Sequence, residues 1–183
     1  MRAHERNIVL TGFKGPGKTA VGRQLAERLG YTFVDLDAVL EAESGMPIPR
    51  LFTERGEAGF RELEARLVER VASQKRCVIA TGGGTIVNPA NLRALKQSGV
   101  VVALTADLET IVSRLATAGD RPILQGDDLR TRVEQLLAER RNAYAQADVT
   151  VDTTARTIDE TVDSVLHAVK AGPFRAPKEP RHA

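Results

Sequence analysis

Several features that would mark whole classes of protein are missing from this sequence of 183 residues. It has a single cysteine, Cys77, which excludes an internal disulfide and favours a reducing compartment. It has no apolar run long enough to cross a bilayer, and no apolar core of a secretory signal follows residues 1–6. We therefore expect a soluble, cytoplasmic protein.

The sequence also lacks an excess of charge of either sign, since 26 basic and 24 acidic residues give a formal net charge of +2. The basic residues are scattered along the chain, so we expect no nucleic-acid or membrane surface and a small-molecule partner. No segment repeats at a fixed period. The length favours one monomeric domain over residues 1–171. Residues 172–183 combine three prolines with charged residues and no apolar period, so we expect them to be disordered.

Short apolar runs alternate with amphipathic stretches, a pattern typical of a parallel sheet covered by helices. The expected strands are residues 8–11, 32–34, 78–80, 100–104 and 149–151. The expected helices are residues 21–29, 38–43, 60–71, 108–115, 133–144 and 162–169. We expect Gly45, Pro47 and Pro49 to break the second of these helices. The pattern predicts an α/β fold, a three-layer, doubly wound, five-stranded parallel sheet that binds ligands beyond the carboxyl ends of its strands.

The most specific motif is formed by residues 12–19, Gly-Phe-Lys-Gly-Pro-Gly-Lys-Thr, which match G-x-x-x-x-G-K-[ST] between an expected strand and an expected helix. Backbone N–H groups and a helix N-terminus at such a loop attract phosphate. The motif predicts ATP binding by Gly15, Pro16, Gly17, Lys18, Thr19 and Ala20. Lys18 would reach the β and γ phosphates, and Thr19 would offer its hydroxyl to Mg²⁺. Pro16 removes one N–H donor, and we expect binding to survive that loss.

Polar or glycine residues also follow two other expected strands. Asp35 and Asp37 would project to the same side if the chain stays extended, so that one could hold Mg²⁺ through water while the other receives a substrate hydroxyl. The alternative for Asp37 is an N-cap of the helix that starts at Ala38. Residues 82–84, three consecutive glycines, either end a strand or bring backbone N–H groups close to a ligand. The absence of an N-K-x-D motif argues against a GTPase.

Together these separated motifs resemble the shikimate kinase family over residues 7–169. They are the phosphate loop, Val34-Asp35-Leu36-Asp37, Gly56-Glu57-x-x-Phe60-Arg61-x-x-Glu64, Ala80-Thr81-Gly82-Gly83-Gly84, Arg121-Pro122-Ile123-Leu124 and an Arg-x-x-x-Tyr pair ending near Tyr144. The resemblance implies a P-loop kinase fold with a lid, which we place at residues 118–128, and a small helical substrate-binding segment.

The implied activity is transfer of the γ-phosphoryl group of ATP to the 3-hydroxyl of shikimate, with Mg²⁺ as cofactor, a step of aromatic amino acid biosynthesis. A kinase for another small hydroxy acid, such as gluconate, is the runner-up. A nucleotide-binding regulatory module that has lost its chemistry is a further alternative. Intact Lys18, Thr19, Asp37 and Arg121 argue against that loss.

The resemblance also implies individual roles. The expected catalytic residues are Lys18, Asp37 and Arg121, with Asp37 as the base. Thr19 and Asp35 would lie at the metal; Arg114, Arg121 and Arg156 would bind ATP; Asp37, Arg61, Gly83, Gly84 and Arg140 would bind the substrate. A planar guanidinium such as that of Arg61 suits a carboxylate, whereas the alternative is an ordinary solvated arginine on a helix.

Two departures from the family pattern concern the substrate site. The family arginine stands four residues before a tyrosine, and counting back from Tyr144 reaches Arg140. The segment lacks the usual proline and is shortened before Asp148, which leaves the adjacent Arg141 as the alternative. Pro49 stands where similar proteins often continue a helix, so we expect it to reshape the substrate-binding segment.

Overall fold

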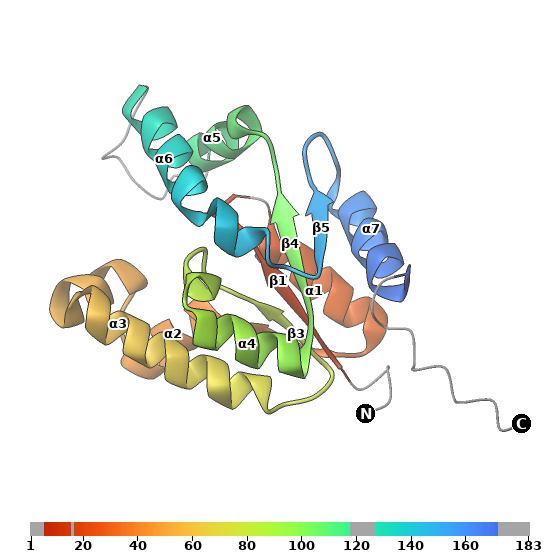
Figure 1. Ribbon diagram of the computed structural model, residues 1–183, viewed down its shortest axis with the longest axis horizontal. Coiled ribbons are helices and arrows are strands. Elements are labelled where there is room, and N and C mark those ends of the chain that lie inside the picture. Colours follow the sequence, from red (N-terminus) through yellow and green to blue (C-terminus); the bar gives the residue numbers. More distant parts are fainter. Residues whose placement is uncertain (1–5, 16, 118–126, 172–183) are drawn as a thin grey trace, which may run out of the picture.

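The computed structural model describes residues 6–15, 17–117 and 127–171. Its centre is a parallel five-stranded sheet in the order β2-β3-β1-β4-β5 (Figure 1), which confirms the predicted fold class. The strands are β1 (Asn7–Thr11), β2 (Thr32–Asp35), β3 (Cys77–Ala80), β4 (Gly99–Thr105) and β5 (Val149–Asp152). In the central register, Val9 of β1 is paired with Ile79 of β3 and with Val101 of β4.

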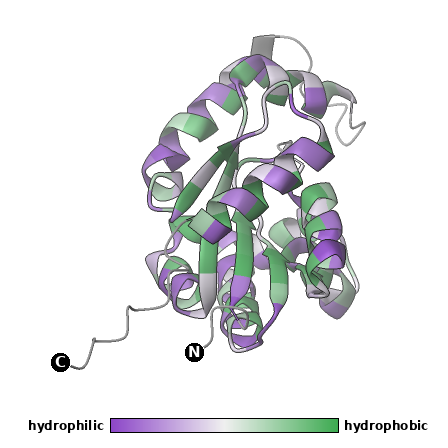
Figure 2. Cartoon of the chain, turned by 90° about the vertical axis from the view of Figure 1, so that its right-hand side faces the viewer, coloured by the Kyte–Doolittle hydropathy of each residue, from purple (hydrophilic) through white to green (hydrophobic). Residues whose placement is uncertain are grey.

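Helices cover both faces of this sheet. One face packs against α1 (Lys18–Leu29) and α7 (Ile158–Ala171). The other face packs against α2 (Leu36–Ser44), α3 (Ile48–Ala72), α4 (Pro89–Ser98), α5 (Leu108–Thr117) and α6 (Asp127–Tyr144). Figure 2 shows the strands as a mostly hydrophobic layer between helices in which hydrophilic and hydrophobic residues alternate. A parallel sheet that is buried on both faces requires such continuous apolar strands.

The strand order brings the functional loops to one edge of the sheet. Because all five strands are parallel, their carboxyl ends meet at the same edge. The phosphate loop follows β1 there, α2 follows β2, and the triple glycine follows β3 before the 3₁₀ turn η2 (Thr85–Val87). Segments that are distant in the sequence therefore become neighbours beyond β2, β3 and β1.

Two helical stretches occur where the sequence indicated none. Helix α2 ends at Ser44 with Gly45 as its C-cap, so the expected break is confirmed. A new helix was not expected directly after it, but Pro47 is the N-cap of α3 and Pro49 lies in its first turn, where proline is tolerated. This first part of α3 extends to Gly56, whose φ of 68° and ψ of 172° interrupt the helix before the predicted second part. Helix α4 was missed because its buried apolar face consists mainly of Leu92 and Leu95, too few residues for a periodic signal.

Some predictions concern residues outside the described ranges. Residues 118–126 of the predicted lid, with Arg121, fall there, as do Pro16 and the tail of residues 172–183. The last two residues assigned to the lid, Asp127 and Asp128, instead begin α6, so that boundary was wrong. None of the described helices is both long and apolar enough to cross a membrane.

Candidate active site

The phosphate loop is shaped by its glycines. Gly12 adopts a φ of 133°, and a Cβ added there would lie 2.2 Å from the carbonyl oxygen of Leu104, so only glycine fits. Gly17, with a φ of 87°, is the N-cap of α1 and offers no side chain to the helix. No capping side chain therefore accepts hydrogen bonds from the first-turn N–H groups of α1, including those near Ala20. These N–H groups can donate to a ligand instead.

Lys18 lies at the start of α1 with its ammonium group turned back over the loop. Its Nζ donates to the carbonyl oxygens of Gly12, at 3.0 Å, and Phe13, at 2.7 Å. Burial lowers the pKa of Lys18 to about 8, although the nearby carboxylates of Asp37 and Asp35 act in the opposite direction. The group is still largely charged at neutral pH.

Asp35 and Asp37 do not lie on an extended segment as expected, because α2 begins at Leu36. Asp35 is the N-cap, and its Oδ1 accepts from the backbone N–H groups of Asp37 and Ala38. The alternative of Asp37 as the cap is therefore wrong. The other carboxylate oxygen of Asp35, Oδ2, accepts from the Thr19 hydroxyl at 2.8 Å, which places the two predicted metal residues side by side.

Asp37 lies in the first turn of α2 and points toward the triple glycine. Burial raises the pKa of Asp37, and the neighbouring carboxylate of Asp35 raises it further, while Lys18 lowers it. A raised pKa makes this carboxylate a better proton acceptor than an ordinary exposed aspartate.

Arg61 is held by its own helix. Its NH1 donates to Oε2 of Glu64 at 2.8 Å, and the side chain of Glu64 is almost fully buried. The other Glu64 oxygen accepts from the Thr85 hydroxyl at 2.6 Å. Phe52 and Phe60, stacked with ring centroids 4.2 Å apart, lie within cation–π distance of the Arg61 guanidinium. Arg61 is therefore a fixed group rather than a solvated surface arginine.

The triple glycine is the place where three distant side chains meet. A Cβ added at Gly84 would lie 2.6 Å from NH2 of Arg61, and one at Gly82 would lie 2.8 Å from Oδ1 of Asp37. A Cβ at Gly83 would lie 3.1 Å from NH1 of Arg140. The missing side chains thus let one carboxylate and two guanidinium groups approach the same stretch of backbone.

Helix α6 decides between the two adjacent arginines. Arg140 lies 5.7 Å from the ring centroid of Phe13 and close to Gly83, on the side of the phosphate loop. On the same side, the Tyr144 hydroxyl donates to the carbonyl oxygen of Gly83 at 2.6 Å. Arg141 instead lines a separate cavity over β4 and β5. The structure therefore places Arg140, and not Arg141, with Asp37 and Arg61.

A third group of residues lies beside the other end of the phosphate loop. Arg114 of α5 donates to the carbonyl oxygen of Gly15 at 3.4 Å, and to the Thr153 hydroxyl and carbonyl oxygens at 3.1 and 3.0 Å. Arg156 lies in the loop after β5, where its side chain donates to the Ser164 hydroxyl. Arg114 thus contacts the phosphate loop directly. Arg156 is linked to that loop only through Thr153, whose carbonyl oxygen accepts from its backbone N–H group.

Comparison with known proteins shows which protein family has this arrangement of residues. The family model described as shikimate kinase matches residues 14–170. A shikimate kinase of Pelotomaculum thermopropionicum is 45% identical over 165 residues, covering 90% of this chain and 96% of that protein. One of Geobacter metallireducens is 42% identical over 160 residues, covering 87% and 89% respectively.

The chain belongs to the shikimate kinase family. Members of this family are ATP-dependent phosphotransferases that act on an alcohol group, so the chain is an enzyme of that class. A solved shikimate kinase of Acinetobacter baumannii, in complex with shikimate, has a TM-score of 0.84 and 36% identity, covering 91% of this chain and 93% of that one. The shikimate kinase of Bacteroides thetaiotaomicron has a TM-score of 0.85 and 35% identity, covering 91% and 99%.

The runner-up substrate class receives less support. A gluconokinase of Sinorhizobium meliloti has a TM-score of 0.60 but only 21% identity over 93% of this chain and 94% of that one. At that identity the likeness concerns the fold alone. The shikimate kinase family assignment is therefore favoured over the gluconate-type alternative.

Two site residues received no role from the sequence. Glu64 was part of a quoted motif, but only the structure shows that it joins Arg61 to Thr85. A signal existed, because Phe60, Glu64 and Leu67 follow the helical spacing of the buried face, and a carboxylate on such a face needs a cationic partner. Tyr144 likewise served only as the reference position for locating the arginine. Its hydrogen bond to Gly83 could not be predicted from residue spacing.

Proposed function

We propose that this enzyme transfers the γ-phosphoryl group of ATP to the 3-hydroxyl of shikimate. The observation that carries the proposal is the meeting of Asp37, Arg61 and Arg140 around the triple glycine. A hydroxylated ring acid needs a cationic reader for its carboxylate and an acceptor for its hydroxyl proton. This site has both kinds of group on one stretch of backbone.

Each polar group of the substrate has a proposed partner. Arg61 and Arg140 bind the carboxylate, and the backbone at Gly83 and Gly84 lies against the ring. Asp37 accepts the hydroxyl proton as the oxygen attacks the γ phosphorus, and its raised pKa suits that role. Because Arg61 and Arg140 come from α3 and α6, the substrate would be held from two sides of the sheet edge.

The phosphate side supplies charge and position. Lys18, the loop N–H groups and the N-terminus of α1 would neutralise the triphosphate, and Arg121 of the proposed lid would add a further cation. Arg114 and Arg156 would flank the adenine. Phosphoryl transfer needs positioning and charge neutralisation more than covalent catalysis, which fits a site of this composition.

The residues present also fit Mg²⁺. The Thr19 hydroxyl and the Asp35 carboxylate lie 2.8 Å apart beside the phosphate loop, and both are the oxygen donors that Mg²⁺ prefers. No group of three or more acidic, histidine or cysteine ligands occurs in the described part of the chain. That suits an ion held by one or two protein oxygens plus phosphate and water. When bound, Mg²⁺ would screen the charge of the transferring phosphoryl group.

The described surface of the enzyme bears on its oligomeric state. Among the described residues, only Val87 and Ile158 are exposed large hydrophobic side chains, and they stand in different elements. A contiguous apolar patch of the size that dimers bury is therefore missing from the described surface. We infer a monomer, with ATP and shikimate as its partners, acting in the cytoplasm.

The direct test is to measure ADP production with ATP, Mg²⁺ and a panel of hydroxy acids. We expect rapid ADP release with shikimate and little with gluconate or with no acceptor. ADP release that does not depend on the acceptor would favour a nucleotide-hydrolysing module instead. Preference for gluconate would transfer the proposal to the runner-up substrate.

The pH dependence of kcat/KM should report the shifted pKa values of Asp37 and Lys18 in the free enzyme. Asp37 must be deprotonated to act as base, and its raised pKa should move the acid limb above the ordinary aspartate range. Lys18 must be protonated, so activity should fall as the pH rises through about 8. Asp37→Asn should remove most activity at every pH. A flat profile from pH 7 to 10 would contradict the role given to Lys18.

Replacing Glu64 with glutamine should raise the KM for shikimate by about tenfold and leave the KM for ATP nearly unchanged, because Arg61 loses its charged anchor. The matched control is Glu57→Gln, since the Glu57 carboxylate lies 3.6 Å from the same guanidinium but is exposed. That control should change little. Equal effects of the two substitutions, with thermal unfolding monitored, would mean that Glu64 does not position Arg61.

A further inference from the structure

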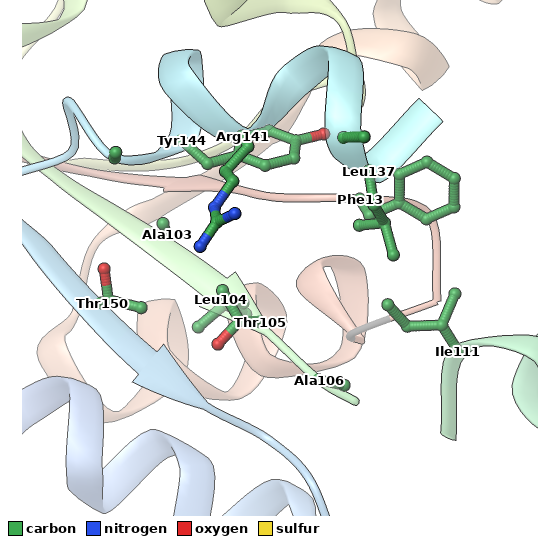
Figure 3. A pocket seen from close by; sticks show the side chains of 12 residues that line it. Phe13, Ala103, Leu104, Thr105, Ala106, Ile111, Leu137, Arg141, Tyr144 and Thr150 are labelled. Atoms are coloured by element: carbon green, nitrogen blue, oxygen red, sulfur yellow. The ribbon is translucent and has the colours of Figure 1, made fainter. Parts of the chain in front are cut away.

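A cavity lies beneath α6, over the carboxyl-terminal half of β4 and the first half of β5 (Figure 3). Its volume is about 430 Å³, within the range of small-molecule pockets. Phe13 and Tyr144 belong both to its lining and to the surroundings of Gly83 and Arg140. Gly83 and Arg140 themselves do not line it. The cavity is therefore a separate site that shares a wall with the substrate site.

The lining is apolar except at one side. Figure 3 shows Phe13, Leu137 and Ile111 toward one side of the cavity and Arg141 and Thr150 toward the other. Arg141 is the only charged residue in this lining, and its guanidinium extends from α6 toward the strands. An arginine on a helix surface usually reaches into water. Here it adds a cation to an otherwise apolar cavity.

The Arg141 guanidinium has no partner that would explain this direction. Among the residues that the structure describes, it makes no ion pair and no side-chain hydrogen bond. Arg28, another exposed arginine, is by contrast paired with Asp159 and Asp163. Five fixed N–H donors beside an apolar wall form a good site for a planar anion.

We propose that this cavity binds a small carboxylic acid with an apolar body. The carboxylate would pair with the guanidinium of Arg141, with the Thr150 hydroxyl beside it, and the apolar body would pack against Phe13, Leu137 and Ile111. Shikimate itself does not fit this description, because its ring carries several hydroxyls that these walls could not satisfy. The ligand is therefore distinct from the substrate of the proposed function.

A ligand bound in the cavity should change the affinity of the substrate site for its ligand. Helix α6 carries Arg140 and Tyr144 toward Gly83 and Arg141 toward the cavity, so a ligand held by Arg141 contacts the same helix. Binding at the two sites is then coupled, and each ligand changes the affinity of the other by the same factor. This consequence rests on the proposed function, whereas the binding itself does not.

The test uses 3-phenylpropanoate as the probe and the uncharged 3-phenylpropanamide as its match. Binding to the full ¹⁵N-labelled chain, without ATP or shikimate, is followed through backbone amide shifts. We expect saturable shifts at residues 103–106 and 145–150, with much weaker binding of the amide. Arg141→Ala should weaken binding of the acid by about ten- to a hundredfold, the loss expected for a charge-assisted bidentate contact.

Two further variants sharpen the result. Arg132→Ala removes an exposed charge elsewhere on α6 and should leave binding unchanged, which separates the specific contact from net charge. Thr150→Phe should fill the cavity and abolish binding while shikimate phosphorylation continues. Shifts confined to residues 82–84, or wild-type affinity in Arg141→Ala, would overturn the proposal. Coupling is overturned if saturating probe leaves the KM for shikimate of the wild type unchanged.

Discussion

Replacing Lys18 with alanine is expected to lower kcat by at least about a hundred- to a thousandfold, the loss typical when one preorganised charge contact to a transition state is removed. Lys18 is half-buried beside the phosphate loop, and its ammonium group is held by the carbonyl oxygens of Gly12 and Phe13. In that low-dielectric position a single charge acts strongly on the transferring phosphoryl group. The measurement is single-turnover phosphorylation of shikimate.

The fold of the variant should survive, because Lys18 contributes no apolar packing to either core. A circular dichroism spectrum identical to that of the wild type is the first control. Lys14→Ala is the matched substitution, since Lys14 is an exposed lysine of the same loop and should affect kcat far less. Near-normal turnover in Lys18→Ala, or equal losses in the two variants, would remove Lys18 from the proposed mechanism.

The local features of the phosphate loop could be predicted because they are contiguous in the sequence. The strand, the glycine spacing and the helix after Lys18 all lie within one short segment, and the structure has them in that order. The five strands were equally accessible, because a buried parallel sheet requires short continuous apolar runs, such as residues 100–104. Where the apolar signal was weak, as in α4, prediction failed.

Local chemistry misled the prediction at α2 and α3. Pro47 and Pro49 were expected only to end a helix, and α2 does end at Ser44, but proline at the first turn costs no intrahelical hydrogen bond, so the same prolines also start α3. Asp35 and Asp37 were treated as part of an extended strand, yet Asp35 caps a helix that begins at the next residue. In both cases the residue types were informative, and only their position relative to the helix start was misjudged.

The assembly of the substrate site could not be worked out from local pattern. Arg61 and Arg140 come from helices on different parts of the sheet, and both reach the triple glycine because β3 lies beside β1 and α6 returns across the phosphate loop. The absence of side chains at residues 82–84 then decides how closely they approach. Family resemblance named these residues, but their common meeting place is a property of the tertiary structure.

Arg140→Ala is expected to lower kcat/KM for shikimate by about ten- to a hundredfold, whereas Arg141→Ala should change it little. Adjacent residues of a helix are about 100° apart around its axis and cannot easily face one carboxylate together. Arg140 lies beside Gly83 and over Phe13, while Arg141 lines the cavity over β4 and β5. One charge therefore faces the proposed substrate, and its neighbour does not.

The two variants control for each other, because each removes one guanidinium from the same turn of α6. Neither should change thermal unfolding greatly, since Arg140 and Arg141 are outside the apolar cores. The loss in Arg140→Ala should fall mainly on shikimate rather than on ATP, because its proposed partner is the substrate carboxylate. A large loss confined to Arg141→Ala would mean that α6 turns the other arginine toward Gly83 when substrate binds. The assignment of Arg140 would then be wrong.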